Sequence, residues 1–93
     1  VRSLGREMAS TGICVTGILP GGFTAPDNSM IRLKENNPKI YDSFIRERLP
    51  RKKMGKVEEI IPLVCLLASD AGSMMNGCCV PIDAGEGTAY ITD

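Results

Sequence analysis

The residues ICVTGIL at positions 13–19 are mostly apolar and show no two-residue alternation. Such a run, rich in branched side chains, is typical of a strand buried on both faces of a parallel sheet. It stops at Pro20, Gly21 and Gly22. Two explanations are open for these three residues: they simply end the strand, or the glycines clear space for a ligand at its end.

A helix is predicted before this strand, in residues 1–9. Val1, Leu4 and Met8 recur at helical spacing, and Thr11-Gly12 follows as a C-terminal stop. The helix has no cap at its start, and the chain begins with Val rather than Met, which predicts a truncated start. Helix, glycine turn and buried strand together form half of a parallel βαβ unit.

Two short helices are predicted in the segment after the glycines. The sequence Asp-Asn-Ser at 27–29 offers an N-cap for the first, and Asn37 with Pro38 begins the second, which ends at Leu49-Pro50. One apolar side is expected on these helices, formed by Met30, Ile31, Leu33, Ile40, Tyr41, Phe44 and Ile45.

A longer helix is predicted in residues 57–68, with two glutamates in its first turn and Pro62 expected to bend it. One broad apolar stripe is expected to face the sheet, formed by Val57, Ile60, Ile61, Val64, Cys65 and Ala68. Residues 78–82 then form a strand, and Pro81 places this strand at a sheet edge.

The apolar surface of this helix extends further than one packing face requires. Because an apolar helix flank beside an open sheet edge is a liability in a monomer, a second copy of the chain is expected to cover both. The sequence therefore predicts a homo-oligomer that forms through Leu63, Leu66, Leu67 and the strand from Cys78 to Ile82.

The charges of the 93 residues balance, with 11 basic and 11 acidic side chains and no histidine. No long-range field attracts nucleic acid or an anionic membrane, and the apolar runs are too short to span a bilayer. Six basic residues crowd positions 46–56 without interleaved aromatic residues. We interpret them as a solvated loop near a helix C-terminus rather than a nucleic-acid site.

The four cysteines, Cys14, Cys65, Cys78 and Cys79, form no C-x-x-C pair, so no metal site is predicted. Three of them lie in apolar stretches, where a free thiol behaves as a small hydrophobe, which suits a reducing cytoplasm. A strained disulfide between Cys78 and Cys79 is the alternative.

Three segments in the order SLGREMASTGICVTGILPGG, MGKVEEIIPLVCLLASD and MNGCCVPIDAG resemble the C-terminal part of a short-chain dehydrogenase/reductase. The resemblance covers nearly the whole chain. It implies an α/β fold, the last two strands and flanking helices of a Rossmann-type doubly wound parallel sheet. Residues 1–93 would be the C-terminal segment of a single domain, with residues 25–48 as a substrate lid.

In the family, the corner after this strand meets the nicotinamide of NAD or NADP. The resemblance carries this role to Pro20, Gly21, Gly22, Phe23 and Thr24. A Cβ at the glycines would collide with the ring, so Gly21→Val is expected to weaken cofactor binding and leave the fold intact. The family's Thr is Ala25 here, which leaves Thr24 one residue early.

The lid would cover a small-molecule carbonyl or alcohol substrate with Met30, Ile31, Leu33, Ile40, Tyr41 and Phe44. Packing of these six residues on the protein body explains them equally well. Other departures from the family pattern are Thr16 for Asn, Lys53 for Arg, and Asp83-Ala84-Gly85 for Asp-Gly-Gly.

The chain lacks the family's catalytic Tyr-x-x-x-Lys and its GxxxGxG turn. Tyr41 is followed four positions later by Ile45, and Tyr90 has no residue at that offset. We therefore assign no catalytic residue and expect the segment alone to be inactive. Two functions stay open: part of an NAD(P)-dependent oxidoreductase that interconverts a carbonyl and an alcohol by hydride transfer, or an inactive fragment that acts only as a partner-binding or structural module.

Overall fold

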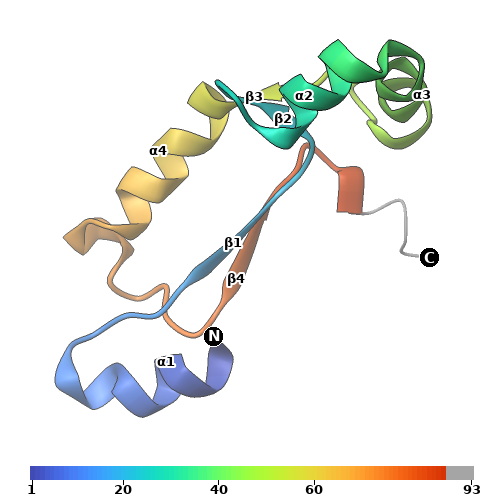
Figure 1. The fold of residues 1–93 in the computed structure, drawn as a ribbon. Helices are drawn as coiled ribbons and strands as arrows, with labels where there is room; N and C mark the ends of the chain where they lie inside the picture. The colour runs from blue at the N-terminus through green and yellow to red at the C-terminus, as the bar shows by residue number, and fades with distance from the viewer. Residues whose placement is uncertain (88–93) are drawn as a thin grey trace.

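A computed structural model describes residues 1–87 of the chain, and its centre is a pair of parallel strands (Figure 1). Strand β1 (Gly17–Pro20) pairs with β4 (Cys79–Ile82), in a register that runs from Gly17 opposite Cys79 to Pro20 opposite Ile82. A second, shorter parallel pair joins β2 (Phe23–Thr24) to β3 (Gly55–Lys56). In the sequence, β2 and β3 both lie between β1 and β4, and the backbone leaves β1 through residues 21 and 22 and enters β2.

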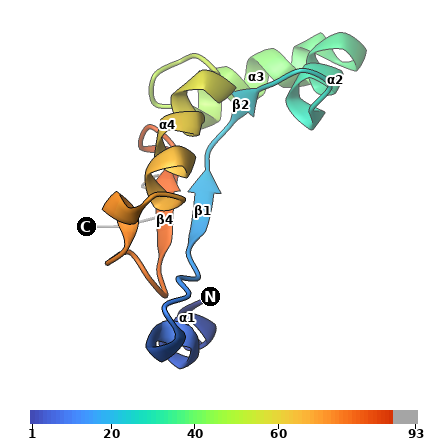
Figure 2. The ribbon, with the colours of Figure 1, turned by 90° about the vertical axis from the view of Figure 1, so that its left-hand side faces the viewer.

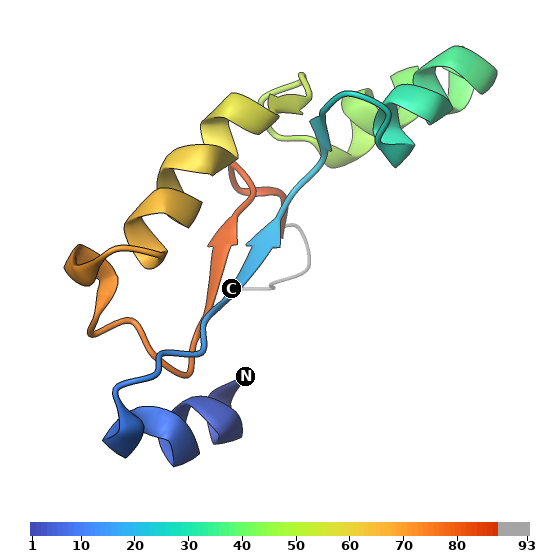
Figure 3. The ribbon, with the colours of Figure 1, turned by 60° about the vertical axis from the view of Figure 1, so that its left-hand side comes forward.

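Helices lie at both ends and on one side of the long strand pair. Helix α1 (Arg2–Met8) lies where the strands begin, and α4 (Val57–Leu67) runs along them (Figure 3). Helices α2 (Ser29–Asn36) and α3 (Pro38–Arg48) form a hairpin beyond the carboxyl ends of β1 and β4 (Figure 1). Short 3-10 turns follow α1 at Ala9–Thr11 and α4 at Asp70–Gly72.

The expected capping residues begin and end the helices. Gly12 closes the turn after α1 with a φ of 83°, in the left-handed region that favours glycine. The Asn28 side-chain oxygen accepts from the Ile31 N–H at 3.0 Å, and that of Asn37 accepts from the Ile40 N–H at 3.3 Å. These short-range predictions are confirmed.

The first strand is shorter and more exposed than the sequence predicts. Residues 13–16 bond mainly to the loop before β4: the Val15 N–H donates to Asn76 Oδ1 at 2.9 Å, and the Cys14 thiol to the Ser73 carbonyl at 3.3 Å. Ile13 is 50% and Leu19 53% exposed. Within the described residues α4 covers one face of the pair (Figure 2), so the prediction of a strand buried on both faces is not confirmed there.

Proline at position 81 is explained by the direction of the ladder. The carbonyls of Cys78 and Ile82 accept from the N–H groups of Gly17, at the start of β1, and Gly21, just after its end. Even-numbered residues of β4 therefore point their backbone groups toward β1, and Pro81, which has no N–H to donate, points away. Among the described residues β4 pairs only with β1, and the outward direction of Pro81 agrees with the predicted edge position, which stays a prediction.

Helix α4 presents a different face to the sheet than the sequence predicts. Ile60 is buried, and Val64, Leu67 and Ala68 line an open space opposite β1. Leu63 is half-buried, whereas Ile61 and Cys65 are exposed on the other side. At about 100° per residue, the stripe centred on Ile60 and Leu67 includes Leu63 and excludes Ile61 and Cys65. The predicted stripe had the wrong phase.

The side chain of Asn76 joins α1 to the segment before β1, which the sequence pattern leaves separate. Its amide nitrogen donates to the Gly5 carbonyl of α1 at 2.8 Å, while its oxygen accepts from Val15 before β1. Gly5 itself packs so closely that a Cβ would lie 2.5 Å from the Gly77 Cα. Asn76 therefore fixes α1 against the start of the strand pair.

Replacing Asn76 with Ala should lower the stability of the intact protein. Both half-buried backbone groups lose their partner, which corresponds to a loss of about 1–3 kcal/mol in the free energy of unfolding. Urea unfolding of Asn76→Ala, beside the exposed control Asn36→Ala, measures the difference. Equal stabilities of the two variants would contradict the role assigned to Asn76.

Candidate functional site

The chain turns sharply at Gly21 and Gly22, where β1 ends, and three segments hold this corner. The Gly21 N–H donates to the Ile82 carbonyl at 3.1 Å and extends the β1–β4 ladder by one bond. The Gly22 N–H donates to Glu86 Oε1 at 2.9 Å, and the Gly22 carbonyl accepts from the Gly55 N–H at 2.9 Å. We call residues 20–24 the corner.

Glycine at position 21 is required by the chain itself. A Cβ there would lie 2.8 Å from the Asp83 Cβ and 2.9 Å from its Cα, on the segment that leaves β4. The expectation that Gly21→Val would leave the fold intact is therefore wrong. A Cβ at Gly22 would meet only side-chain atoms, 3.0 Å from Phe44 Cε1 and 3.3 Å from Met54 Sδ.

A cavity of about 140 Å³ lies beside the corner, between it, the end of β4 and the start of α4. Of the five residues expected to bind the cofactor, Gly21, Gly22 and Phe23 line this cavity. Pro20 does not, and Thr24 lines a separate depression with Ile31. Ligand pockets usually measure about 300–1,000 Å³, so this cavity holds at most a small group.

Charged residues on the rim of the cavity pair with one another. The Arg51 guanidinium contacts Glu59 at 2.9 and 3.4 Å, with the two side chains 37% and 46% exposed. The hydrogen bond from Arg51, aided by the Lys56 N–H, lowers the pKa of the Glu59 carboxyl from 4.5 to about 2. The stability that this pair contributes is therefore present above pH 4.5 and is lost as the pH falls toward 2.

Lys52, within the basic segment, bonds to the end of the preceding helix. Lys52 Nζ donates to the Arg46 carbonyl at 2.7 Å, near the C-terminus of α3. Its backbone adopts a φ of 60°. Residues 46–48 belong to α3 and 55–56 to β3, so the loop is limited to residues 49–54, where Lys52 lies near the helix C-terminus as expected.

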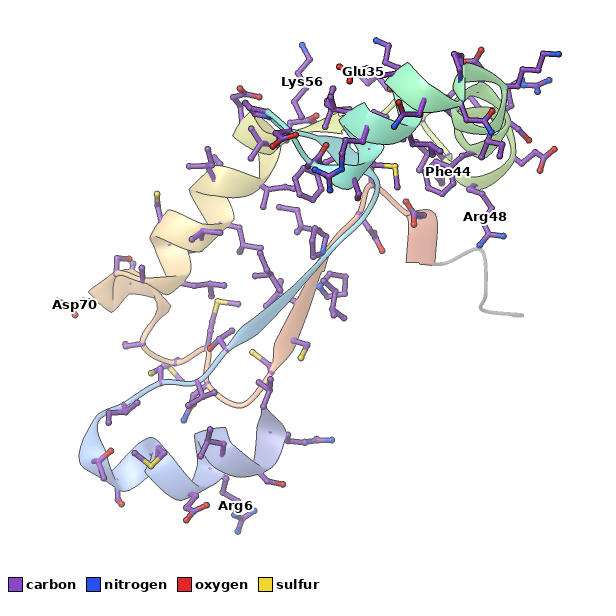
Figure 4. All side chains as sticks on the ribbon, viewed as in Figure 1. Arg6, Glu35, Phe44, Arg48, Lys56 and Asp70 are labelled. Carbon is purple, nitrogen blue, oxygen red and sulfur yellow. The ribbon has the colours of Figure 1, made fainter. Side chains whose placement is uncertain are left out.

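The six predicted lid residues divide between packing and the corner. Tyr41 is buried in the α2–α3 hairpin, where Lys34 Nζ lies 5.8 Å from its ring, and Ile40 is 54% exposed. Phe44 contacts the corner at Gly22, and Figure 4 shows it on the side of α3 that faces the strand ends. Met30, Ile31 and Leu33 are half-buried on α2.

Two residues of this region have roles that were not predicted from the sequence. Glu86 bonds to the corner, and Asp83 shapes the turn that carries Glu86: its carboxylate oxygens each accept at 3.0 Å, one from the Gly85 N–H and one from the Gly87 N–H. An Asp followed by glycines is a known turn signal, which could have revealed this turn. Nothing local in the sequence indicates that Glu86 reaches Gly22.

The described residues contain no group of three or more Cys, Asp or Glu placed to hold a metal ion. Their cysteines are free thiols, Cys78 and Cys79 included. None of the helices in residues 1–87 is long and apolar enough to cross a membrane. Tyr90, the second tyrosine considered for catalysis, lies outside the described residues.

Parallel strands with a glycine corner at their carboxyl ends define an α/β protein of the open-sheet class, which binds ligands at this edge. The chain belongs to the short-chain dehydrogenase/reductase family, since the family model described as Enoyl-(Acyl carrier protein) reductase matches residues 1–86. The predicted family and the predicted α/β fold with parallel strands are thereby confirmed, the placement of the chain in the C-terminal part of the domain stays a prediction, and the relatives are oxidoreductases.

Among these relatives is levodione reductase of Leifsonia aquatica, 39% identical over 90% of this chain and 32% of its own. The crystal structure of a levodione reductase superposes with a TM-score of 0.78 at 37% identity, over 96% of this chain and 35% of that chain. A 3-oxoacyl-(acyl-carrier-protein) reductase of Pseudomonas aeruginosa is 32% identical over 90% of this chain and 32% of its own.

A third relative is named for its cofactor. The 2-dehydro-3-deoxy-L-rhamnonate dehydrogenase (NAD(+)) of a Sphingomonas species is 26% identical over 94% of this chain and 32% of its own. The chain thus spans about a third of the length of the curated relatives it matches.

Alanine at the two corner glycines separates their roles. Gly21→Ala should lower the free energy of unfolding of the intact protein by about 1–3 kcal/mol, because the backbone at Asp83, just after β4, must move. Gly22→Ala should lower the free energy of unfolding by a smaller amount, since the Phe44 ring and the Met54 sulfur can shift. Thermal and urea unfolding of both variants test this order. A Gly21→Ala variant as stable as wild type would refute the close contact with Asp83.

Proposed function

We propose that the intact protein is an NAD(P)-dependent oxidoreductase that interconverts a carbonyl and an alcohol by hydride transfer. Residues 1–93 would form the C-terminal part of its single Rossmann-type domain. The observation that carries the proposal is the glycine corner at the carboxyl end of parallel strand β1, in a chain of the short-chain dehydrogenase/reductase family.

The corner leaves one backbone donor for a ligand. Bonding of the Gly22 carbonyl to Gly55 in the β2–β3 pair directs the Phe23 N–H away from β3. The Phe23 carbonyl already accepts from Asn28 Nδ2 at 2.9 Å. Within the described residues, the β2–β3 ladder therefore gives the Phe23 N–H no acceptor on β3. This donor suits the carboxamide of NAD or NADP, with Pro20, Gly21, Gly22 and Thr24 shaping the surroundings.

Residues 25–48 are proposed as the substrate lid, with the Phe44 ring beside Gly22 of the corner. The substrate is a small-molecule carbonyl or alcohol. Tyr41 and Leu49 are the two most deeply buried residues of this region, at 8% and 5% exposure, so we assign them to packing. Phe44 and the half-buried residues of α2 remain as candidates for contact with substrate.

The experiment that tests the proposal follows NADH and NADPH consumption by the intact protein with a panel of ketones and aldehydes. We expect turnover with one of the two cofactors, and none by residues 1–93 alone, which contain no Tyr-x-x-x-Lys. An intact protein that neither binds nor oxidises NADH and does neither with NADPH would contradict the proposal. It would favour the alternative of a partner-binding or structural module.

An exposed apolar surface on α4 supports a homo-oligomer of the intact protein. Ile61 is 48% and Leu66 43% exposed, beside the exposed Cys65. Of the residues first proposed for this surface, Leu67 lines the space opposite β1 and Leu63 is half-buried, which leaves Leu66 and the edge of β4 as its main parts.

Light scattering of Leu66→Glu in the intact protein tests this surface. We expect an oligomeric wild type and dissociation of the variant, because the interface would bury an unpaired charge. Ile40→Glu, at an exposed apolar residue of α3 (54%, against 43% for Leu66), is the matched control and should leave the oligomer intact. A monomeric wild type, or an undiminished oligomer in folded Leu66→Glu, contradicts the proposal.

A further inference from the structure

The peptide groups at Gly22 are held on both sides by segments distant in sequence. The N–H donates to a Glu86 carboxylate oxygen at 2.9 Å, across 64 positions, and the carbonyl accepts from the Gly55 N–H at 2.9 Å. A hydrogen bond to a carboxylate is about twice as strong as one between neutral groups. The rotation of the peptide between Gly21 and Gly22 is therefore restricted by Glu86.

The turn after β4 places Glu86 for this contact. The Glu86 N–H donates to the Asp83 carbonyl at 3.0 Å, and both carboxylate oxygens of Asp83 accept from the backbone of Gly85 and Gly87. Ala84 and Gly85 adopt φ values of 52° and 88°, in the left-handed region that reverses the chain. Glu86 is half-buried, so its bond to Gly22 is partly shielded from water.

We propose that Glu86 is a positioning residue of the cofactor site. The Phe23 N–H lies in the same peptide plane as the Gly22 carbonyl, which the Gly55 N–H holds. Glu86 holds the preceding peptide, so the two bonds together fix the backbone of Gly22, and with it the direction of the Phe23 N–H, before the cofactor arrives. A donor that is already oriented binds with a smaller loss of conformational entropy than one that must be ordered on binding. This inference rests on the proposed function, because it assigns the Phe23 donor to the cofactor.

Titration of the intact protein with NADH and NADPH, with Glu86→Ala and Glu86→Gln, tests the role of Glu86. We expect Glu86→Ala to raise the Kd and KM of the preferred cofactor about tenfold, the equivalent of losing one charge-assisted hydrogen bond. The kcat at saturating cofactor should change much less. Glu86→Gln keeps an acceptor oxygen and should recover most of the affinity. Glu7→Ala, on α1 at the far end of the strands, is the control and should behave as wild type.

A purely structural role for Glu86 predicts a different result. In that case Glu86→Ala would have a lower melting temperature, and the Kd and KM of the folded variant would equal those of wild type. This result would overturn the proposal. Amide hydrogen exchange at Gly22 provides a second readout, and it should accelerate in Glu86→Ala; unchanged exchange would also overturn the proposal. If Glu86→Ala does not fold, the same comparison uses Glu86→Asp, whose shorter side chain cannot reach Gly22.

The outcomes separate this inference from the proposed function. A wild type that binds neither NAD(H) nor NADP(H) refutes the proposed function, and the positioning role with it. If the wild type binds one of these cofactors and folded Glu86→Ala binds it with the same Kd, only the positioning role is refuted.

Discussion

The parallel pairing of β1 with β4 is the constraint on which the other features of this chain depend. It brings residues 17–20 beside residues 79–82, and the bond from the Gly21 N–H to the Ile82 carbonyl carries the ladder into the corner. Because both strands run in the same direction, their carboxyl ends meet. The close approach of Gly21 to Asp83 and the bond between Gly22 and Glu86 follow from this meeting.

The other end of the strand pair depends on the same register. The Gly77 N–H donates to the Val15 carbonyl at 2.8 Å, just before the ladder begins, and the neighbouring Asn76 holds α1 in place. Helix α4 connects β3 to β4 along the chain and covers one face of the β1–β4 pair (Figure 2). The strand pair thus positions α1, α4 and the corner.

Features set by neighbouring residues could be predicted from the sequence. The caps at Gly12, Asn28 and Asn37, and the outward direction of Pro81, follow from the conformational limits of single residues. Motif order was also sufficient to identify the family, because separate segments such as Pro-Gly-Gly and Asn-Gly occur at the correct places.

Features set by distant contacts could not be predicted. An apolar helix such as α4 offers several overlapping stripes, and only the packing of Ile60 and Leu67 selects among them. The requirement for Gly21 comes from Asp83, 62 positions later in the sequence numbering. The pattern at the corner is explained by both the chain's own packing and the proposed ligand. Contact with Asp83 accounts for Gly21, and the donor of Phe23 is what remains for a cofactor.

The most direct test of this account is the backbone amide signal of Phe23 in the intact protein, followed by NMR during titration with the preferred nicotinamide cofactor. The account predicts a large, saturable shift of the Phe23 amide at the same cofactor concentration that saturates binding. The Gly22 amide should stay protected from exchange, because Glu86 already holds it. Saturable cofactor binding that leaves the Phe23 signal unchanged would contradict the assignment of the corner as the cofactor site.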